Sequence, residues 1–458
     1  MNKYKLNIEL NHFELLSNLT DLLFFQMLSS FGKRFDSKGA KPLDPKDLIY
    51  TNLYGQFGVD LESSRKRGDW VDTEKLLAKG RDWIIDQVKK SEIRGRGGAG
   101  FATGTKMSYL PKKVGKKPHY LVINGDEGEP GTCKDRQVLL NEPHKIIEGA
   151  LLTSYAIQAH TCYAYIRGEF RYEIQRLQKA IDEAYKEKLI GKNNKFGWDF
   201  DVHIFSGAGA YVCGEETALL NSISGLPGHP RYKPPYPSKA GLFNAPTLVN
   251  NVETISSIPA ICRRGGEWYS SIGVPGSKGT KIYCISGNVN NPCVVEEAMG
   301  VPIKYLIEKY GGGVIGGWDN LLGVFPGGMS CKMLTAEEAS EAIMSFDDLE
   351  EYDSAFGTGA LIVLDKSVDL LGTFARVAKF YEKESCGQCE PCRSGTARIA
   401  DIIERLSNGT GKKKDIKLLE QAAKKNNPCC CGLAPAGADP IKGLLRHYRK
   451  EVEKLVKD

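Results

Sequence analysis

The segment Val202-His-Ile-Phe205-Ser-Gly207-Ala-Gly209-Ala-Tyr211-Val-Cys213-Gly-Glu215-Glu216-Thr217 combines three local patterns that together indicate an α/β fold. Residues 202–205 are strand-like, the glycines predict a turn, and the residues from Thr217 onward have helix-like character. A strand, a glycine turn and a helix N-terminus in this order can present free backbone amides to a phosphate. Glu215 and Glu216 also suit helix capping, so both interpretations stay open for them.

The composition of the chain sets the limits for every other interpretation. It has 458 residues with 50 glycines, 13 cysteines and a net charge of +6. The length predicts two to four domains, and 41% hydrophobic with 26% charged residues excludes a wholly disordered chain. Basic and acidic residues are interleaved, which argues against nucleic-acid binding. No run of 18 or more apolar residues predicts a membrane-spanning helix.

The patterning divides the chain into four sections that indicate a multidomain α/β and α+β protein. We expect an irregular lead-in at 1–75, an α/β domain at 76–260, a β-grasp-like module at 275–345 and a helical bundle at 365–458. Within the lead-in, residues 27–40 resemble an organelle presequence that begins at an internal methionine. The predicted strands are 120–123, 202–205 and 281–286, and the predicted helices are 73–88, 171–188, 303–310, 370–384, 396–406, 416–425 and 441–456.

A second glycine-rich segment, Gly95-Arg-Gly97-Gly-Ala-Gly100, matches the G-x-G-x-x-G pattern of dinucleotide-binding turns. A true fingerprint follows a strand, whereas residues 85–91 look helical, so a standard Rossmann unit is not predicted. Arg94 and Arg96 add positive charge beside exposed amides, which suits a phosphate. The alternative is a flexible surface loop.

Three further segments carry polar or aromatic side chains of the kind that bind cofactors. Asn124-Gly-Asp126-Glu127-Gly-Glu129 places acids on a glycine-bearing turn, which suits sugar hydroxyls and the edge of a heterocycle. A Ca²⁺ or Mg²⁺ site and a plain acidic turn are the alternatives. Lys233-Pro-Pro-Tyr236 presents a cation and a ring on a rigid stretch, and Asn250-Asn251 offers two adjacent amides.

The cysteines near the C-terminus have the spacing of a cluster site. Cys386-Gly-Gln-Cys389-Glu-Pro-Cys392 is a C-x₂-C-x₂-C run, the usual way to supply three ligands to a [4Fe–4S] cube. A fourth ligand must come from elsewhere, and Cys429-Cys430-Cys431 can supply it, although the spacing does not say which cysteine does. Zinc and a purely structural role are the alternatives.

In this order, the loops and the cysteine run resemble the NADH-binding flavoprotein subunit of respiratory complex I over residues 45–450. The resemblance implies a non-standard FMN- and NADH-binding α/β domain, a β-grasp insertion and a C-terminal helical bundle that holds the cluster. It implies an NADH dehydrogenase in which hydride passes from NADH to FMN and electrons then pass singly to the [4Fe–4S] cluster and on towards ubiquinone. No side chain is expected to act as a nucleophile or general base.

The resemblance also implies roles for individual residues. The residues it places around FMN are Gly95, Arg96, Gly97, Lys106, Asn124, Asp126, Glu127, Gly214, Glu215, Asn250 and Asn251. The residues it places around NADH are Phe101, Tyr109, Glu129, Glu216, Lys233 and Tyr236. For the cluster it implies Cys386, Cys389 and Cys392, with Cys431 as the fourth ligand because Cys431-Gly-Leu fits the family run best.

Partners and location follow from the same resemblance. It implies a [2Fe–2S] partner subunit, a large multi-cluster iron–sulfur subunit and peripheral membrane association through the complex. The presequence-like segment favours the matrix side of the mitochondrial inner membrane, with the cytoplasmic face of a bacterial inner membrane as the alternative. Two other functions stay open: the diaphorase subunit of a soluble NAD-linked hydrogenase or formate dehydrogenase, and a non-catalytic assembly homologue.

Overall fold

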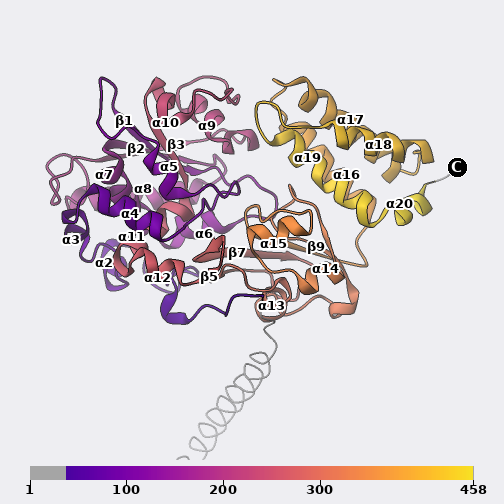
Figure 1. Cartoon of the computed structure of the whole chain (residues 1–458), viewed down its shortest axis with the longest axis horizontal. Coiled ribbons are helices and arrows are strands. Elements are labelled where there is room, and N and C mark those ends of the chain that lie inside the picture. Colours follow the sequence, from indigo (N-terminus) through magenta and orange to yellow (C-terminus); the bar gives the residue numbers. More distant parts are fainter. Residues whose placement is uncertain (1–37, 457–458) are drawn as a thin grey trace, which may run out of the picture.

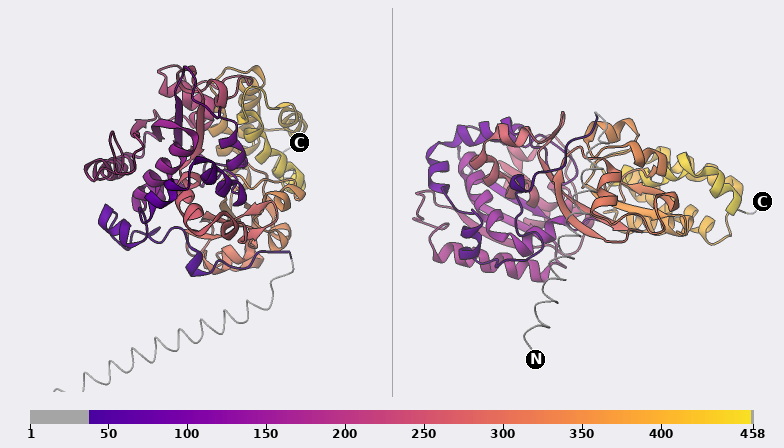
Figure 2. Two further views of the ribbon diagram at one scale, coloured as in Figure 1. Left: turned by 60° about the vertical axis from the view of Figure 1, so that its left-hand side comes forward. Right: turned by 90° about the horizontal axis from the view of Figure 1, so that it is seen from below.

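Three packed units follow one another in the chain, as Figures 1 and 2 show. The computed structural model describes residues 38–456. The α/β unit (indigo to magenta) and the helical bundle (yellow) lie at opposite ends of the long axis, with a second sheet between them (Figure 2, right). Residues 27–37 of the predicted presequence-like segment lie outside the described residues. In the part of the chain that the structure describes, no helix is both long and apolar enough to cross a membrane.

The first unit is built on a four-stranded parallel sheet in the order β3-β2-β1-β4. Its strands are β1 (His119–Gly125), β2 (Ala159–Ile166), β3 (Asp201–Ser206) and β4 (Thr247–Asn251). This order matches the first four strands of a doubly wound dinucleotide fold. Its helices are η1 (Pro45–Asp47), α2 (Leu61–Lys66), α3 (Thr73–Ala78), α4 (Arg81–Lys90), α5 (Thr103–Ser108), α6 (Lys134–Asn141), α7 (Pro143–Ile157), α8 (Arg171–Lys186), η2 (Tyr211–Gly214), α9 (Glu216–Ile223), α10 (Pro237–Ala240), η3 (Leu242–Asn244), α11 (Val252–Arg264) and α12 (Gly266–Ser270).

The G-x-G-x-x-G segment lies before β1 and after α4, so it does not form the first strand–helix turn of this sheet. The prediction that it is not a standard fingerprint is therefore confirmed. The single helix predicted at 73–88 is wrong in one respect, because the chain breaks into α3 and α4 at Gly80. Gly80 has φ +91°, a left-handed conformation that glycine adopts without a steric cost.

The second unit is a five-stranded mixed sheet in the order β10-β9-β11-β7-β8. β7 (Thr280–Gly287) and β8 (Cys293–Ala298) form an antiparallel hairpin, and β11 (Ala360–Asp365) lies parallel to β7. The sheet therefore includes a strand well beyond residue 345. The remaining strands of the sheet are β9 (Leu321–Phe325) and β10 (Leu334–Thr335), while β5 (Gly273–Val274) and β6 (Ser277–Lys278) form a separate two-stranded sheet. The helices of this unit are α13 (Ile303–Lys309), η4 (Trp318–Asn320), α14 (Ala336–Glu341) and α15 (Phe346–Glu351).

The third unit is the predicted helical bundle. It contains α16 (Leu370–Glu384), α17 (Glu390–Ser407), α18 (Lys413–Lys425), α19 (Leu433–His447) and α20 (Arg449–Leu455). The apolar faces of these helices enclose one core that includes Phe374, Ile403, Leu419 and Leu444. The helix predicted at 441–456 is instead the end of α19 followed by the separate α20, with a break at Tyr448.

Buried charges join the first two units. Glu253 at the start of α11 accepts hydrogen bonds from Lys281 Nζ (2.7 Å) and the backbone N–H of Ile282 (2.8 Å) in β7. Its carboxylate also pairs with Lys134 Nζ at 3.0 Å. Glu253, Lys134 and Lys281 are each at most 2% exposed, so this network is desolvated and holds β7 against the α/β unit. Burial raises the pKa of Glu253, but the two lysines outweigh it and bring the pKa below its usual value.

A strap at residues 38–57 crosses the same junction. The backbone N–H of Tyr50 donates to Glu296 Oε2 of β8 at 2.8 Å, while Tyr50 Oη contacts Ser256 of α11 at 2.7 Å. Tyr50 is 4% exposed. This strap is packed into the core of both units. The part of the predicted irregular lead-in that the structure describes also contains the helix α2 and the start of α3, so it is not irregular throughout.

Glu253→Ala should destabilise the protein strongly, because it leaves two buried lysines without their shared carboxylate. Breaking one partner of a buried ion pair costs about 3–5 kcal/mol. The measurement is the midpoint of thermal unfolding. Glu62→Ala is the matched control, because Glu62 pairs with Lys66 while 79% exposed and should change stability by less than about 1 kcal/mol. Equal midpoints for the two variants would contradict the role given to Glu253.

Candidate functional site

The site lies at the carboxyl ends of β1 and β4, where the strand order of the parallel sheet reverses. The chain runs outward from β1 through β2 to β3 and then returns to place β4 on the other side of β1. Ligands of open parallel sheets bind in the crevice at such a switch point. Asn124 and Asn251 are directly paired in register there, which explains why two sequence-distant asparagines lie at one site.

A cavity of about 450 Å³ opens at this point, and all three units line it. The α/β unit contributes the loop after β1, the glycine segment and η2, the second unit contributes Ser330 and Thr358, and the bundle contributes the start of α19. The predicted site residues that line it are Gly97, Asn124, Asp126, Glu127, Glu129, Gly214, Glu215, Asn251 and Cys431. Lining residues that sequence reasoning missed include Thr132, Lys134, Asp135, Tyr211, Ser330 and Thr358.

Two residues predicted for FMN have buried polar atoms without a partner among the described residues, and one of them, Asp126, lines the cavity. Asp126 Oδ2 and Asn250 Nδ2 are buried and make no hydrogen bond within residues 38–456. Burial raises the pKa of Asp126 to about 7. An unpaired acceptor and an unpaired donor are costly unless a ligand satisfies them. The unpaired oxygen of Asp126 lines the cavity and fits the hydroxyl-rich chain of FMN, whereas Asn250 is not among the lining residues.

Two other predicted acids use their oxygens to cap helices. Glu127 accepts hydrogen bonds from the backbone N–H groups of Asp135 (2.8 Å) and Arg136 (3.1 Å) at the start of α6. Burial, followed by the nearby Asp135 charge, raises the pKa of Glu127 to about 8. Glu215 accepts from the amides of Thr217 and Ala218. Of the two interpretations of Glu215, the structure favours capping, since its carboxylate occupies the amides of Thr217 and Ala218 at the start of α9.

Lys134 is the cation that sequence reasoning missed at the cavity wall. It is 1% exposed, and its Nζ lies 2.7 Å from Asp135 Oδ1 and 3.2 Å from Asn251 Oδ1. Burial lowers its pKa, but the surrounding carboxylates outweigh this and raise it, so the lysine is charged. Its position directly after the acid-bearing loop could have suggested that Lys134 belongs to the site. The sequence does not show, however, that its side chain points into the protein.

A second set of charges beside the cavity joins Lys106, predicted for FMN, to Glu216 and Lys233, predicted for NADH. Lys106 Nζ lies 2.7 Å from Glu216 Oε2, and Lys233 Nζ lies 3.2 Å from Glu216 Oε1. Burial raises the pKa of Glu216, but the two lysines outweigh it and lower the pKa, so this carboxylate is ionised. The polar group is therefore assembled from α5, α9 and the Lys233 segment.

Three exposed aromatic residues predicted for NADH are Phe101, Tyr109 and Tyr236, each about half exposed or more. The rings of Phe101 and Tyr109 lie 6.1 Å apart between centroids. Such rings offer apolar faces on which a base can stack. Glu129 is more enclosed, and its carboxylate accepts from Tyr211 Oη at 2.6 Å and from the Ser330 N–H at 2.8 Å. Burial raises the pKa of Glu129.

The side chain of Arg96 lies apart from the cavity. Its guanidinium donates to Tyr269 Oη at 2.9 Å and to the Lys278 carbonyl at 2.7 Å, and Arg96 is 2% exposed. Neither Arg96 nor Gly95 lines the cavity, whereas Gly97 does. Gly98 has φ +117°, and Gly100 at φ +63° has no room for a Cβ because Phe346 would lie 2.5 Å from it. The glycines therefore shape the loop, while Arg96 anchors it from behind.

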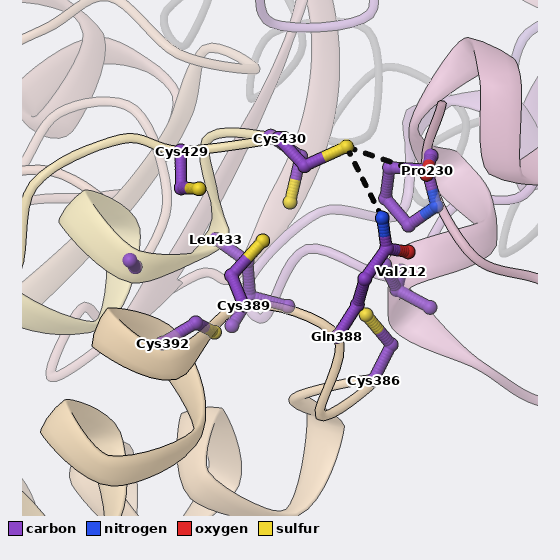
Figure 3. Close-up of a pocket in the computed structure, with 11 residues that line it drawn as sticks. Val212, Pro230, Cys386, Gln388, Cys389, Cys392, Cys429, Cys430 and Leu433 are labelled. Carbon is purple, nitrogen blue, oxygen red and sulfur yellow. Dashed lines mark hydrogen bonds between the residues drawn. The ribbon is translucent and has the colours of Figure 1, made fainter. Parts of the chain in front are cut away.

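The cysteines surround a second pocket (Figure 3). Cys386 follows α16, Cys389 and Cys392 open α17, and the triplet 429–431 precedes α19. Cys429 and Cys430 face the run from the opposite side of the pocket (Figure 3). Among residues 38–456, no three Cys, His, Asp or Glu side chains form a group that could hold a single ion. Cysteine thiols that line a pocket from two sides fit a [4Fe–4S] cube, because each of its four irons takes one thiolate ligand.

The two pockets are contiguous. Val212, Cys431 and Leu433 line both of them. Cys430 Sγ instead contacts the Pro230 carbonyl at 3.3 Å and accepts from Gln388 at 3.6 Å, and Cys429 is exposed. Cys431 is thus the member of the triplet that lies between the cluster pocket and the cavity.

Comparisons with known proteins agree with this geometry. Family models match for the Nuo51 FMN-binding domain over residues 88–260, the SLBB domain over 281–363 and the NADH-ubiquinone oxidoreductase-F iron–sulfur binding region over 372–455. The sheet of the second unit is thus that of an SLBB domain. The three models cover the three units in order.

Full-length relatives share about half of their residues with this chain. The NADH-quinone oxidoreductase subunit designated F in Rickettsia bellii is 54% identical over 416 residues, which is 90% of this chain and 100% of the relative. The mitochondrial NADH dehydrogenase [ubiquinone] flavoprotein 1 of Dictyostelium discoideum is 52% identical over 418 residues, 91% of this chain and 87% of the relative.

A solved NAD⁺-reducing [NiFe]-hydrogenase has the same fold, with a TM-score of 0.77. It is 32% identical over 85% of this chain and 66% of the hydrogenase chain. The higher identity to the respiratory subunits argues against the hydrogenase diaphorase alternative. The chain belongs to the same family as these NADH-quinone oxidoreductase subunits, the flavin- and iron–sulfur-dependent components through which electrons from NADH enter the respiratory enzyme.

Proposed function

We propose that this chain oxidises NADH in the cavity at the β1–β4 switch point and delivers the electrons through the cysteine pocket. The observation that carries this proposal is the shared wall of Val212, Cys431 and Leu433 between the two pockets. FMN supplies the chemistry, because it accepts two electrons as a hydride and releases them one at a time. Cys386, Cys389, Cys392 and Cys431 would hold a [4Fe–4S] cluster, which would supply the single-electron path onward towards ubiquinone.

The residues of this chain would position FMN and exclude water from the site. Asp126 offers an unpaired carboxylate oxygen for the polyhydroxy chain of FMN, and Asn124 and Asn251 fix the adjoining wall. Asn250, whose buried amide is also unpaired, lies beside Asn251 outside the cavity lining. Gly97 and Gly214 allow close approach, and Glu127 and Glu215 hold the two helices that border the pocket. Lys106 lies alongside through its link to Glu216, while Gly95 and Arg96 support the glycine segment from outside the cavity.

NADH would lie between the aromatic residues and the charged group. Phe101, Tyr109 and Tyr236 offer stacking surfaces for the adenine, while Glu216 and Lys233 would hold ribose hydroxyls. Glu129, held by Tyr211 and Ser330, would face the nicotinamide. Fixing both reactants in one geometry is the contribution expected of the protein, without a nucleophile or general base.

Membership of the family implies partner subunits, because the chain supplies only one of the enzyme's parts. We propose a [2Fe–2S] subunit and a large multi-cluster iron–sulfur subunit as these partners. We further propose peripheral attachment through the complex on the matrix side of the mitochondrial inner membrane. Relatives of similar identity are both bacterial and mitochondrial.

The decisive experiment is NADH-dependent reduction of ferricyanide by anaerobically reconstituted protein, together with flavin and iron analysis. We expect turnover with one FMN and four irons per chain, as a single cube requires. Iron without flavin or turnover would contradict the catalytic proposal and favour the assembly homologue.

Asp126 gives the FMN site a predicted pH dependence. Because its pKa is about 7 in the ligand-free cavity, a ligand that donates hydrogen bonds to the carboxylate must bind with loss of a proton below that pH. FMN affinity should therefore rise about tenfold between pH 6 and 8 and level off above this range. The measurement is FMN titration of the apoprotein by fluorescence quenching.

Asp126→Asn is the matched variant, because it keeps the shape and removes the titrating group. It should bind FMN more weakly at pH 8 and lose this part of the pH dependence. Glu127 titrates nearby with a pKa of about 8, so Glu127→Gln serves as the comparison. A pH dependence that survives in Asp126→Asn and disappears in Glu127→Gln would contradict the role given to Asp126.

The cluster assignment predicts a difference within the cysteine triplet. Cys431→Ser should lower bound iron and alter the electron paramagnetic resonance of the reduced cluster, because it removes a ligand beside the cavity. Cys429→Ser is the control, since Cys429 is exposed, and it should keep both signals unchanged. Full iron content and an unaltered spectrum in Cys431→Ser, with loss in Cys429→Ser, would reverse the assignment.

A further inference from the structure

Two cysteines that the flavin and cluster sites do not use meet where the α/β unit contacts the second sheet. Cys133 is the residue before α6, and Cys284 lies in β7, 151 positions along the chain. The backbone N–H of Cys133 donates to Cys284 Sγ at 3.3 Å, and each thiol shifts the pKa of the other. These contacts bring both sulfurs to one place without a disulfide.

The two thiols differ in access. Cys133 is partly exposed and lies between Thr132 and Lys134, which both line the large cavity. Cys284 is 1% exposed. A soluble oxidant can therefore reach Cys133 but not Cys284 directly.

The thiols also differ in acidity. The hydrogen bond from Cys284 lowers the pKa of Cys133 to about 7, against the opposing effect of burial, and Arg136 lowers it further. The same pairing, followed by burial, raises the pKa of Cys284 well above its usual value. A large share of Cys133 is thus thiolate near neutral pH, which is the nucleophilic form, while Cys284 keeps its proton.

We propose that Cys133 and Cys284 are a peroxide-sensitive pair that closes to a disulfide linking α6 to β7. The Cys133 thiolate attacks one oxygen of hydrogen peroxide, the O–O bond breaks, and Cys133 becomes a sulfenic acid while the other oxygen leaves as hydroxide and takes up a proton to form water. Cys284 sulfur then attacks Cys133 Sγ, and its proton leaves with the displaced hydroxide as a second water. Two thiols are oxidised and one peroxide is reduced to two waters.

The strand register distinguishes Cys284 from its neighbour Cys293. Cys284 is paired with Val294 and Ile285 with Cys293 in the β7–β8 hairpin. Because side chains alternate along a strand, Cys284 and Cys293 point to opposite faces of the sheet. Cys293 Sγ instead contacts the Tyr310 carbonyl at 3.5 Å. The geometry therefore assigns the resolving role to Cys284.

The test is disulfide mapping of the full-length, cofactor-loaded protein after a short exposure to equimolar hydrogen peroxide. Free thiols are blocked with N-ethylmaleimide in denaturant, and tryptic peptides are analysed by mass spectrometry without reduction. The tryptic peptide 282–304 contains both Cys284 and Cys293, so the variants must separate them. We expect a peptide pair linked through Cys133 in the wild type, lighter by two hydrogen atoms than the sum of its parts.

The matched variants decide the assignment. Cys293→Ser should keep the linked pair, whereas Cys284→Ser and Cys284→Ala should lose it. In Cys284→Ser, which keeps a donor beside Cys133, added dimedone should trap Cys133 as the adduct of a sulfenic acid, and in Cys284→Ala this adduct should form more slowly. Flavin content before oxidation shows that each variant is folded. Unoxidised Cys133 in the wild type, or a link that persists in both Cys284 variants and disappears in Cys293→Ser, would overturn the proposal.

Discussion

The carboxylate of Glu253, buried between Lys134 and Lys281, is the constraint on which the rest of the site depends. It pairs with one lysine from each of two units. If either unit moved away, a buried charge would be left without its partner, which is energetically costly. Lys134 in turn contacts Asp135 and Asn251, which line the cavity. The same network therefore fixes the junction of the sheets and the cavity wall. The proposed reaction depends on two aromatic ring systems held in register, so it needs a rigid cavity more than it needs a reactive side chain.

The third unit is joined to the first through the cofactor pockets themselves. The start of α19 places Cys431 and Leu433 against Val212 of η2, so that one wall serves both pockets. Tyr211 strengthens this contact, because its ring packs against Phe380 of α16 while its hydroxyl donates to Glu129. The bundle thus does more than hold cysteines, since it also closes one side of the cavity.

Local sequence patterns predicted much of this fold and part of the site. The strand at 202–205, the hairpin strand at 281–286 and the helix at 370–384 appear within one or two residues of their predicted bounds, because each has a clear apolar period between turn residues. The parts that could not be predicted depend on long-range contacts. Nothing near Arg96 in the sequence shows that its guanidinium is buried against Tyr269, and nothing near Lys134 shows that Glu253 and Lys281 surround it. The cysteine run was readable from its spacing, whereas the placement of Cys431 required the start of α19.

The acidic residues of the glycine-bearing loops have two different roles: most of them bond to the protein itself, and one is available to contact a ligand. Asp126, Glu127, Glu129 and Glu215 all belong to loops that suggested cofactor binding, and all line the cavity. Glu127 and Glu215 are already committed to backbone amides, and Glu129 to Tyr211 and Ser330. Asp126 alone among these four has a buried oxygen without a partner in the described chain. A buried carboxylate whose oxygens already accept hydrogen bonds costs the fold little free energy when no ligand is bound. A buried carboxylate oxygen without a partner favours the binding of a ligand that donates a hydrogen bond to it. Asp126 is therefore the acid of these loops whose environment is explained by a ligand rather than by the fold.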